Sequence, residues 1–476
     1  MRIVCAASLA ALLGACAVGP DYHAPDSTVP PNWTVDPPWQ FARPDDSIDR
    51  GSWWQLFADT RLNELEEAAL AGNPGLAQAQ ERLVQARASA TATAAGLFPQ
   101  LNLTGAAVRD KISANRPRGN YSVPNVSTVQ NDFTGGFSLQ YELDLFGGTR
   151  RQVEAARAGE QQAQALVANV RLVLTAEVAA DYFNLRALDA EIDVVGRNIA
   201  AQRRALEFVA TRHDAGAASG LDLAQQQAQL DTTITQIDLL RVQRAQYEHA
   251  LAALVGAPAP GFTIAAEPAI LNVPPIPVGV PADLLQRRPD IAAAERAMAA
   301  ANAQIGVAKA AFFPAVSLGS TYGRESNELS ALFQAASSAW SLGLSASQSL
   351  IDFGQRRANV DFAQAGYRAT VDAYRGAVLT GMQEVEDGMT GLANLERAAA
   401  EAAAAVHSAQ RVVDLANDRY TGGLANYLDV VTAQQALLAN ERQQVQINGQ
   451  QMLVAVYLIK ALGGGWENEI TGALAR

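Results

Sequence analysis

The chain has 476 residues, 49% of them hydrophobic and only 7% aromatic, and its formal net charge is −12. An acidic balance of this size argues against a nucleic-acid partner. Both cysteines, Cys5 and Cys16, lie close to the N-terminus, so the sequence predicts no disulfide and no thiol chemistry in the rest of the chain. A composition rich in alanine, leucine and glutamine with few aromatic residues is typical of long helices.

The first residues have the pattern of an export signal. A basic residue precedes an apolar run over 3–13, which is too short to span a membrane in the mature protein. The run ends in Leu13-Gly14-Ala15-Cys16, the order of a lipobox, whose cysteine accepts a lipid group that adds membrane affinity. We therefore predict a signal peptide over 1–15 and lipidation of Cys16, and Ala17 favours the outer membrane as the destination. A plain signal peptide with a chance cysteine is the alternative.

An extended arm, two helices and a β-hairpin are expected next. Prolines recur along residues 16–59, which favours an extended arm over a separate domain. Helices are predicted over about 60–72 and from 74 to about 96. The β-hairpin over about 100–146 shows the alternation of apolar and polar residues that is typical of strands with one apolar face. Within it, the polar stretch from about 109 to 131 predicts a long loop.

A helical pattern replaces the alternation after the hairpin. From 149 to about 211, apolar residues recur at seven-residue intervals, as in a long helix that packs against neighbours in a coiled coil. A turn and a returning helix complete a predicted helical hairpin over about 149–256. The residues that carry the pattern are Val178, Leu185, Ile192, Ile199 and Leu206.

This combination of hairpins occurs twice. Residues from Phe353-Gly354 to Leu428-Asp429 match those from Phe146-Gly147 to Leu221-Asp222 at a constant offset of 207 positions. A constant offset over such a distance indicates a tandem structural duplication. The predicted parts are a first repeat over 60–256, a proline-rich linker over 257–287, a second repeat over 288–463, with a β-hairpin at about 315–352 and a helical hairpin at about 354–463, and a tail over 464–476.

Four strands with one apolar face cannot close on themselves, because a small filled barrel needs about eight strands. Strands of roughly ten residues can cross a bilayer at a tilt. The sequence contains no twenty-residue apolar helix, so any crossing would use the strands. Three chains would pool twelve strands and twelve helical segments. The alternative is that each hairpin belongs to an ordinary sheet packed on helices.

Three motifs resemble those of the outer membrane factor family, and they stand in family order around the duplicated unit. More closely, the chain resembles the lipoprotein channels of resistance–nodulation–division efflux pumps, relatives of the TolC-type exit duct, over essentially the whole mature chain. The resemblance implies a mainly α homotrimer, with a twelve-stranded transmembrane β-barrel in the outer membrane on a twelve-helix α-barrel that extends into the periplasm. The motifs are Ala17-Val18-Gly19-Pro20-Asp21-Tyr22, Trp53-Trp54-Gln55-Leu56-Phe57-Ala58-Asp59 and Ala461-Leu462-Gly463-Gly464-Gly465-Trp466.

The resemblance also implies partners and a function. A periplasmic adaptor protein would dock at the periplasmic end of the helices and connect the channel to an inner-membrane pump. The channel would then passively export drugs or other small toxic compounds. Two alternatives stay open: the exit duct of a protein or peptide secretion system, and a lipid-anchored periplasmic coiled-coil scaffold whose strand hairpins are small soluble sheets.

The sequence has no set of residues typical of catalysis. The histidines are scattered, without carboxylates or cysteines at metal-ligand spacing. No serine stands in a nucleophile-elbow pattern, and no glycine-rich loop fits a phosphate cradle. We therefore expect no enzyme activity, no cofactor and no metal site. The histidines are His23, His213, His249 and His407.

The two turns of the helical hairpins, over 212–222 and 419–429, are better functional candidates. Glycine permits a tight reversal, and a polar side chain can cap the outgoing helix. We expect contacts with an adaptor and a closing ring of polar links at these turns; turn formation with no further role is the alternative. The candidate turn residues are Gly216, Ser219, Gly220, Gly422, Gly423 and Asn426.

The resemblance implies a gate at these turns, where a tyrosine, the arginine after it and an aspartate on the outgoing helix narrow the pore. Tyr420 matches the tyrosine, but Thr421 stands in place of the arginine and Thr432 in place of the aspartate. The gate of this chain is therefore expected to be weaker or built differently.

Two arginine–aspartate pairs near the turns are candidate substitutes for the missing gate residues. They are Arg212 with Asp222 and Arg419 with Asp429, and links of this kind are charge-assisted and directional. Replacing Asp222 and Asp429 by alanine is expected to raise single-channel conductance.

Overall fold

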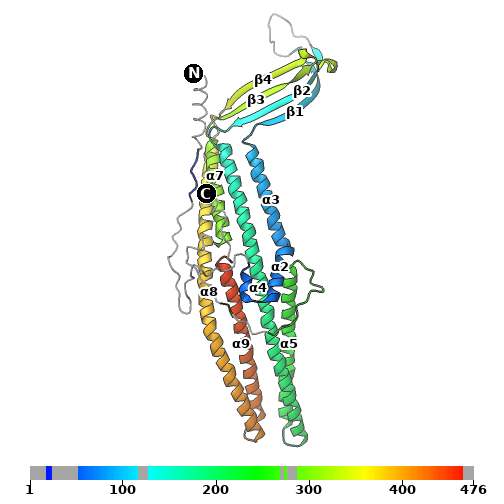
Figure 1. The fold of residues 1–476 in the computed structure, drawn as a ribbon, viewed down its shortest axis with the longest axis vertical. Helices are drawn as coiled ribbons and strands as arrows, with labels where there is room; N and C mark the ends of the chain where they lie inside the picture. The colour runs from blue at the N-terminus through cyan, green and yellow to red at the C-terminus, as the bar shows by residue number, and fades with distance from the viewer. Residues whose placement is uncertain are drawn as a thin grey trace. The chain divides into compact units, whose positions relative to one another are not determined.

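The computed structural model describes residues 18–23, 52–115, 127–268, 273–274, 276 and 287–464. The described part is mainly helical and contains one four-stranded sheet (Figure 1). Contacts divide it into two compact units, and neither unit coincides with one of the sequence repeats. Unit 1 contains the described parts of Met1–Pro25, Val84–Gln162 and Glu295–Ala373, and unit 2 contains those of Asp26–Leu83, Ala163–Ala294 and Tyr374–Arg476.

The sheet belongs to unit 1 and takes two strands from each repeat. The strands pair antiparallel in the order β1-β2-β3-β4, so the hairpins of the two repeats join through β2 and β3 (Figure 1). The short 3₁₀ helices η3 (Leu329–Ala331) and η4 (Ala335–Ser337) connect the last two strands. The strands are β1 (Gln100–Ile112), β2 (Thr128–Leu143), β3 (Ala315–Ser326) and β4 (Ser338–Ser347).

The register gives the sheet one apolar face. Leu103 pairs with Phe137, Phe137 with Tyr322, and Tyr322 with Trp340. Paired residues project to the same side of an antiparallel sheet, so these four form an apolar row. On the other face Thr321 and Ser341 exchange a hydroxyl hydrogen bond of 2.7 Å. The alternation predicted for the strands is therefore confirmed.

The predicted loop between the first two strands was too long. Residues 109–112 of β1 pair in register with residues 128–131 of β2, where the sequence predicted loop from about 109 to 131. Apart from Ile112 and Val129 their side chains are polar and exposed, and strand pairing needs only backbone groups, so composition alone gave the wrong boundary. Between these strands, residues 116–126 lie outside the described part.

Residues 18–23 pack in unit 1 against helices of both repeats. The N–H of Val18 donates to the carbonyl of Phe146 (3.1 Å), and Asn302 Nδ2 donates to the carbonyl of Pro20 (3.0 Å). Arg151 Nη2 lies 2.7 Å from Asp21 Oδ1. The end of the predicted arm is thus held to α4 (Gly148–Asp214) and α7 (Pro289–Ala310).

Long helices form most of unit 2, and some of them also have residues in unit 1. The helix predicted from 149 to about 211 is α4, and Figure 1 shows α5 returning beside α4 and α9 beside α8. The remaining helices are η1 (Trp53–Phe57), α2 (Thr60–Gly72), α3 (Pro74–Ala95), α5 (Gly220–Leu254), α8 (Gln355–Thr421) and α9 (Tyr427–Ala461). Positive φ angles at Gly463 and Gly464 end α9, as the glycine run predicted.

The heptad pattern of α4 faces the interior of unit 2. Val178 and Leu185 are fully buried and Ile199 nearly so, while Ile192 and Leu206 pack against a neighbouring apolar cluster. The sequence predicted no twenty-residue apolar helix, yet by length and composition alone α4 is long and apolar enough to cross a membrane. One 18-residue window of α4 is apolar enough, and 44% of that window is buried inside the protein. Core helices of soluble proteins share this property.

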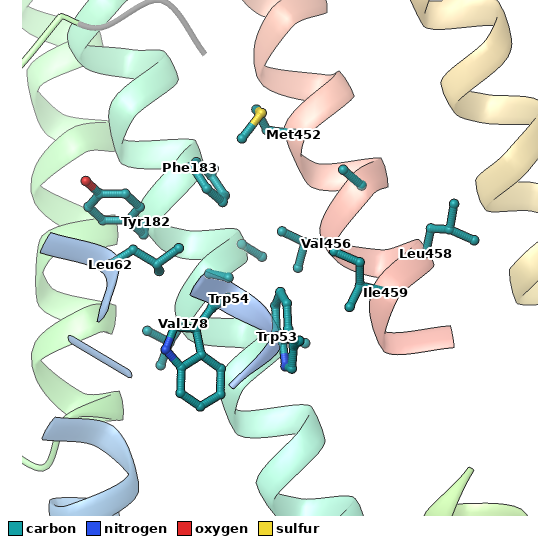
Figure 2. Close-up of a cluster of buried hydrophobic side chains, with 14 of the residues drawn as sticks. Trp53, Trp54, Leu62, Val178, Tyr182, Phe183, Met452, Val456, Leu458 and Ile459 are labelled. Atoms are coloured by element: carbon teal, nitrogen blue, oxygen red, sulfur yellow. The ribbon is translucent and has the colours of Figure 1, made fainter. Parts of the chain in front are cut away.

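The main core of unit 2 gathers around the two tryptophans of η1. Figure 2 shows Trp53 and Trp54 among side chains of α4 and α9. Both rings are buried, and Trp53 Nε1 donates to Thr175 Oγ1 at 3.1 Å. Burial of one large apolar side chain contributes roughly 1.5–3 kcal/mol. The labelled core residues are Trp53, Trp54, Leu62, Val178, Tyr182, Phe183, Met452, Val456, Leu458 and Ile459.

A buried ion-pair network fixes the start of the linker. Asp189 accepts hydrogen bonds from Arg186 (3.0 Å) and Arg244 (2.6 Å). The same arginines donate to the carbonyls of Ala265 (2.8 Å) and Ile264 (2.6 Å). The described linker residues 257–268 form no regular helix, as their prolines predicted.

Glu66 of α2 contrasts with this network. Its carboxyl is fully buried, and neither oxygen has a hydrogen-bond partner. Burial raises the pKa of the Glu66 carboxyl to about 9, because the charged form would lose its hydration without a compensating contact. The side chain is therefore neutral at pH 7.

Candidate functional site

The turn between α4 and α5 is shaped by one glycine and a pair of backbone hydrogen bonds. The N–H of Gly216 donates to the carbonyl of His213 (2.9 Å), and the N–H of Ala217 donates to that of Arg212 (2.7 Å). These two bonds form a Schellman motif. Gly216 has a φ of 73°, a conformation that side chains with a Cβ rarely adopt.

The turn between α8 and α9 repeats this arrangement. The N–H of Gly423 donates to the carbonyl of Tyr420 (3.0 Å), the N–H of Leu424 donates to that of Arg419 (2.8 Å), and Gly423 has a φ of 71°. Each of these residues stands 207 positions after its counterpart. The other two glycines belong to helical backbone: Gly220 begins α5, and the N–H of Gly422 donates to the carbonyl of Asp418 as in a helix. Each reversal therefore depends on one glycine, Gly216 in the first turn and Gly423 in the second.

Both outgoing helices are capped as predicted, but the two caps differ. Ser219 Oγ accepts from the N–H of Asp222 (3.2 Å), and the Asp222 carboxylate accepts in return from the N–H of Ser219 (3.3 Å). This is a capping box. Asn426 Oδ1 accepts from the N–H of Asp429 (3.2 Å), and within the described residues no return bond from the Asp429 carboxylate is seen.

Tyr420 connects the second hairpin to both helices of the first. Its hydroxyl donates to Asp222 Oδ2 at 3.4 Å, and the Arg212 guanidinium lies over its ring, 5.2 Å from the centroid. The side chain is only 7% exposed. Burial, followed by the nearby Asp222 carboxylate, raises the pKa of the Tyr420 hydroxyl, so it remains a neutral donor at physiological pH.

Tyr427 extends this contact along α5. Its ring lies 4.9 Å from that of Tyr420 in an edge-to-face arrangement, and its hydroxyl donates to Gln226 Oε1 at 2.7 Å. Gln226 is fully buried, and its amide nitrogen donates to the carbonyl of Gln202 (2.9 Å). We call Arg212, Asp222, Gln226, Tyr420 and Tyr427 the tip cluster.

The energetics of the tip cluster rest mainly on ring burial. The tyrosines pack with Val209, Val430 and Val431, all of them buried. Burying a ring of this size contributes roughly 1.5–3 kcal/mol, whereas each hydrogen bond adds about 1 kcal/mol. The apolar contact therefore provides the stability, and the hydrogen bonds fix which residues meet.

The two arginine–aspartate ion pairs that the sequence suggested are not formed within this chain. Among the described residues, no ion pair joins Arg212 to Asp222 or Arg419 to Asp429. In the first pair, the Tyr420 side chain contacts both members and takes the place of a direct link. In the second pair, both side chains are exposed.

The two threonines that depart from the expected gate make local hydrogen bonds. The Thr421 hydroxyl donates to the carbonyls of Asn417 and Asp418, and the Thr432 hydroxyl donates to that of Leu428. Each bond lies within the threonine's own helix, and both side chains are exposed. Neither threonine links the two hairpins in this structure.

Further polar contacts join the hairpins away from the turns. Arg442 Nη2 of α9 lies 2.7 Å from Glu191 Oε1 of α4. Asn198 Nδ2 donates to Glu441 at 2.6 Å, and Gln435 donates to Gln229 at 2.5 Å. These bonds run between α9 and the first hairpin, so they hold the two repeats together over several helical turns.

A groove of about 680 Å³ lies between α4, α5 and α9, and its lining mixes amide side chains with apolar and acidic ones. At its edge, burial and then the neighbouring Glu177 raise the pKa of the Asp181 carboxyl to about 6. Within the part of the chain that the structure describes, no group of three histidine, cysteine, aspartate or glutamate side chains could hold a metal ion.

Sequence reasoning missed Tyr427 and Gln226. Tyr427 stands inside the predicted turn but has Gly220 as its counterpart in the first repeat, so the duplication gave no reason to single it out. Gln226 carries no sequence signal beyond a polar residue on an expected helix. The lipidation candidate Cys16 lies outside the described residues.

Comparisons with known proteins point in one direction. The family model described as outer membrane efflux protein matches residues 65–257 and 280–464. The pyoverdine export outer membrane protein OpmQ of Pseudomonas aeruginosa is 32% identical over 466 residues, which cover 98% of this chain and 97% of that protein. The toluene efflux pump outer membrane protein TtgF of Pseudomonas putida is 31% identical over 467 residues, covering 97% and 96%.

A solved structure shares the fold. The outer-membrane channel OprN matches with a TM-score of 0.88 at 29% identity, and the match covers 95% of this chain and 100% of that one. The similarity thus extends over nearly the full length of both chains.

Proposed function

Because this chain belongs to the outer membrane efflux protein family, we propose that it is the outer-membrane exit duct of a tripartite efflux pump that exports drugs or other small toxic compounds. The family match carries this proposal, since it takes in both repeats, and relatives aligned over nearly their whole length are named as export or efflux pump proteins. The sequence has no phosphate-binding loop, so transport is passive and a partner supplies the energy.

The assembly that fits this function is a homotrimer. The sheet has an apolar face and two edge strands, β1 and β4, and an open edge needs a partner strand or a cover. Three copies would pair β1 of one chain with β4 of the next and give a twelve-stranded transmembrane barrel. The helical hairpins of three chains would form the twelve-helix α-barrel in the periplasm.

The N-terminus would add a lipid anchor to this assembly. A fatty-acyl group on Cys16 contributes roughly 0.8 kcal/mol per buried methylene, and it would hold residues 18–23, which pack on α4 and α7, close to the membrane. The supporting observation is the lipobox order of residues 13–16.

The hairpin turns would meet a periplasmic adaptor protein, which connects the duct to the inner-membrane pump. The turns present exposed residues around the Schellman motifs, while the tip cluster lies buried between the hairpins. We propose that the tip cluster holds the hairpins of one chain together in the closed duct. Its release would widen the periplasmic end, and Tyr420, rather than a direct ion pair, is its central member.

Gene deletion tests the proposed function most simply. Cells lacking the gene should become sensitive to several unrelated toxic compounds, and a copy with the intact sequence should restore resistance. The purified mature protein should also form pores in planar bilayers and run as a trimer in detergent. Loss of a single secreted protein, with no change in sensitivity, would favour a secretion duct instead. A detergent-independent, water-soluble monomer would contradict any duct.

A further inference from the structure

The register of the sheet assigns each strand residue to one of two faces. We call the face that carries Leu103, Phe137, Tyr322 and Trp340 the apolar face, and the face that carries Ser138 and Thr321 the polar face. Residues directly opposite each other in an antiparallel pair lie on the same face, and successive residues alternate between faces.

The two faces separate the charged residues of the described strands by sign. Every basic residue of the described strands falls on the apolar face, and every acidic one falls on the polar face. Opposite charges on neighbouring residues of one strand, such as Arg109 and Asp110, thus point to opposite sides. The basic residues are Arg109, Lys111 and Arg324, and the acidic residues are Asp110, Asp132, Glu142 and Glu325.

The basic residues lie at one end of the apolar band. The band runs from the row of Leu143 and Val316, past the aromatic row of Phe137, Tyr322 and Trp340, to the row of Ala107 and Phe133, which is ten residues along β2, or about 33 Å. Aromatic rows of this kind mark the edge of the apolar band in membrane barrels. All three basic residues follow the row of Phe137, Tyr322 and Trp340 towards the loop end of the strands: Arg324 by two residues, and Arg109 and Lys111 by six and eight, which places these two beyond Phe133 as well.

This loop end is the end away from the helices. β1 begins five residues after α3 ends, and β3 begins five residues after α7 ends, so the helices join the sheet at the opposite strand ends. In a duct whose helices extend into the periplasm, the loop end reaches the outer surface. Its basic residues therefore stand at the headgroup level of the outer leaflet.

The side chains of Arg109 and Lys111 are available for a ligand. Both are exposed, and within the described residues neither makes an ion pair. Arg324 donates to the backbone carbonyls of Phe333 and Gln334. Neutral carbonyls leave its positive charge uncompensated, so all three residues contribute to one positive patch on a surface that otherwise faces acyl chains.

We propose that Arg109, Lys111 and Arg324 bind the phosphate groups of anionic glycolipids in the outer leaflet, a proposal that rests on the proposed membrane duct. Arginine forms bidentate, charge-assisted hydrogen bonds with phosphate, and lysine adds a point charge. Basic residues at an anionic membrane surface each strengthen binding several-fold. The apolar rows beside them contact the acyl chains of the same lipid.

The test uses the full-length lipoprotein, purified in a mild detergent and titrated with a glycolipid bearing two phosphates, with binding followed by native mass spectrometry. A chemically dephosphorylated form of the same glycolipid is the second ligand. We expect the wild type to bind the phosphorylated form about tenfold or more tightly than the dephosphorylated form. In the double variant Arg109→Gln/Lys111→Gln this preference should fall to about twofold.

A matched control changes charged residues of β1 and β2 on the polar face. The double variant Asp110→Asn/Asp132→Asn alters two charges but should keep the full lipid preference. An unchanged preference in Arg109→Gln/Lys111→Gln, or an equal loss in the control, would overturn the proposal. So would full competition by millimolar inorganic phosphate, because it would identify a site for free anions and not for lipid.

Pore formation separates this inference from the proposed function. Both double variants replace exposed side chains and should give trimers and wild-type conductance in planar bilayers. If pores form but the lipid preference does not depend on the basic residues, only the lipid site is wrong. If the wild type forms neither pores nor trimers, the proposed function fails first.

Discussion

The turns of the two helical hairpins share a backbone but not their side-chain contacts. Gly216 and Gly423 make equivalent Schellman bonds at an offset of 207 positions. The side chains around them differ: His213 stands at the position equivalent to Tyr420, and Gly220 at the position equivalent to Tyr427. The second repeat therefore supplies both aromatic rings of the tip cluster.

The charged residues of the two turns differ in role although they are the same in type. Arg212 and Asp222 of the first turn contact Tyr420, whereas the equivalent Arg419 and Asp429 are exposed. Duplication thus produced two similar backbones, and divergence made them complementary: one copy provides rings and the other provides polar partners. Arg212, Asp222 and Tyr420 consequently have natural controls in the other repeat, namely Arg419, Asp429 and His213.

Tyr420→Ala should have the largest effect. It removes a buried ring, a change that costs roughly 3–5 kcal/mol in protein cores, and it leaves Arg212 and Asp222 without their shared partner. We expect faster hydrogen exchange at the turn amides and a several-fold rise in single-channel conductance. His213→Ala, at the equivalent exposed position, removes only a ring contact with the carbonyl of Ala218 and should leave conductance unchanged and affect exchange far less. Equal effects of the two variants would contradict the assigned role of Tyr420.

Tyr427→Phe should have the next largest effect. It keeps the ring but leaves the buried Gln226 oxygen without its 2.7 Å hydrogen bond, which costs about 1–3 kcal/mol. Hydrogen exchange in the first turns of α5 and α9 should accelerate accordingly. Tyr457→Phe serves as the control, because that residue is 52% exposed. If the two variants exchange at the same rate, the hydrogen bond does not stabilise the tip.

Asp222→Ala should act more strongly than Asp429→Ala. The first change removes a capping box and the acceptor for Tyr420, whereas the second removes only an exposed carboxylate; loss of a cap costs about 1 kcal/mol. Conductance should rise clearly in the Asp222 variant and little in the Asp429 variant. A larger rise in conductance in the Asp429 variant would show that the second turn, and not the first, has the gating role.

Arg212→Gln should give the smallest of these effects. It removes the guanidinium over the Tyr420 ring, an interaction of about 0.5–1 kcal/mol at a partly exposed site. The equivalent Arg419→Gln should have no measurable effect on turn exchange. Comparing the two variants by hydrogen exchange in low salt would show whether the cation–π contact contributes. The same small acceleration in both would mean that it does not.

Local sequence signals predicted local structure well. Alternation predicted the strands, the seven-residue spacing predicted which side of α4 is buried, and glycines with Ser219 and Asn426 predicted the turns. Each of these features depends on residues that are close in sequence. The strand ends at residues 109–112 were missed because a polar stretch can still pair through its backbone.

Contacts between distant segments could not be predicted in the same way. Tyr420 and Asp222 are 198 positions apart, and nothing in either hairpin alone shows that an aromatic ring of one lies between the arginine and the aspartate of the other. The sequence offered the direct pair Arg212 with Asp222, which is chemically reasonable. The geometry of the packed hairpins decides against it.

A double-mutant cycle on single-channel conductance tests most directly that Tyr420 and Asp222 act together to hold the hairpins closed. The variants are Tyr420→Phe, Asp222→Ala and their combination in the full-length protein. Because both single changes remove the same contact, the double variant should conduct no more than the higher of the two singles. Conductance increases that multiply in the double variant would show that the two residues act independently, and they would contradict the account.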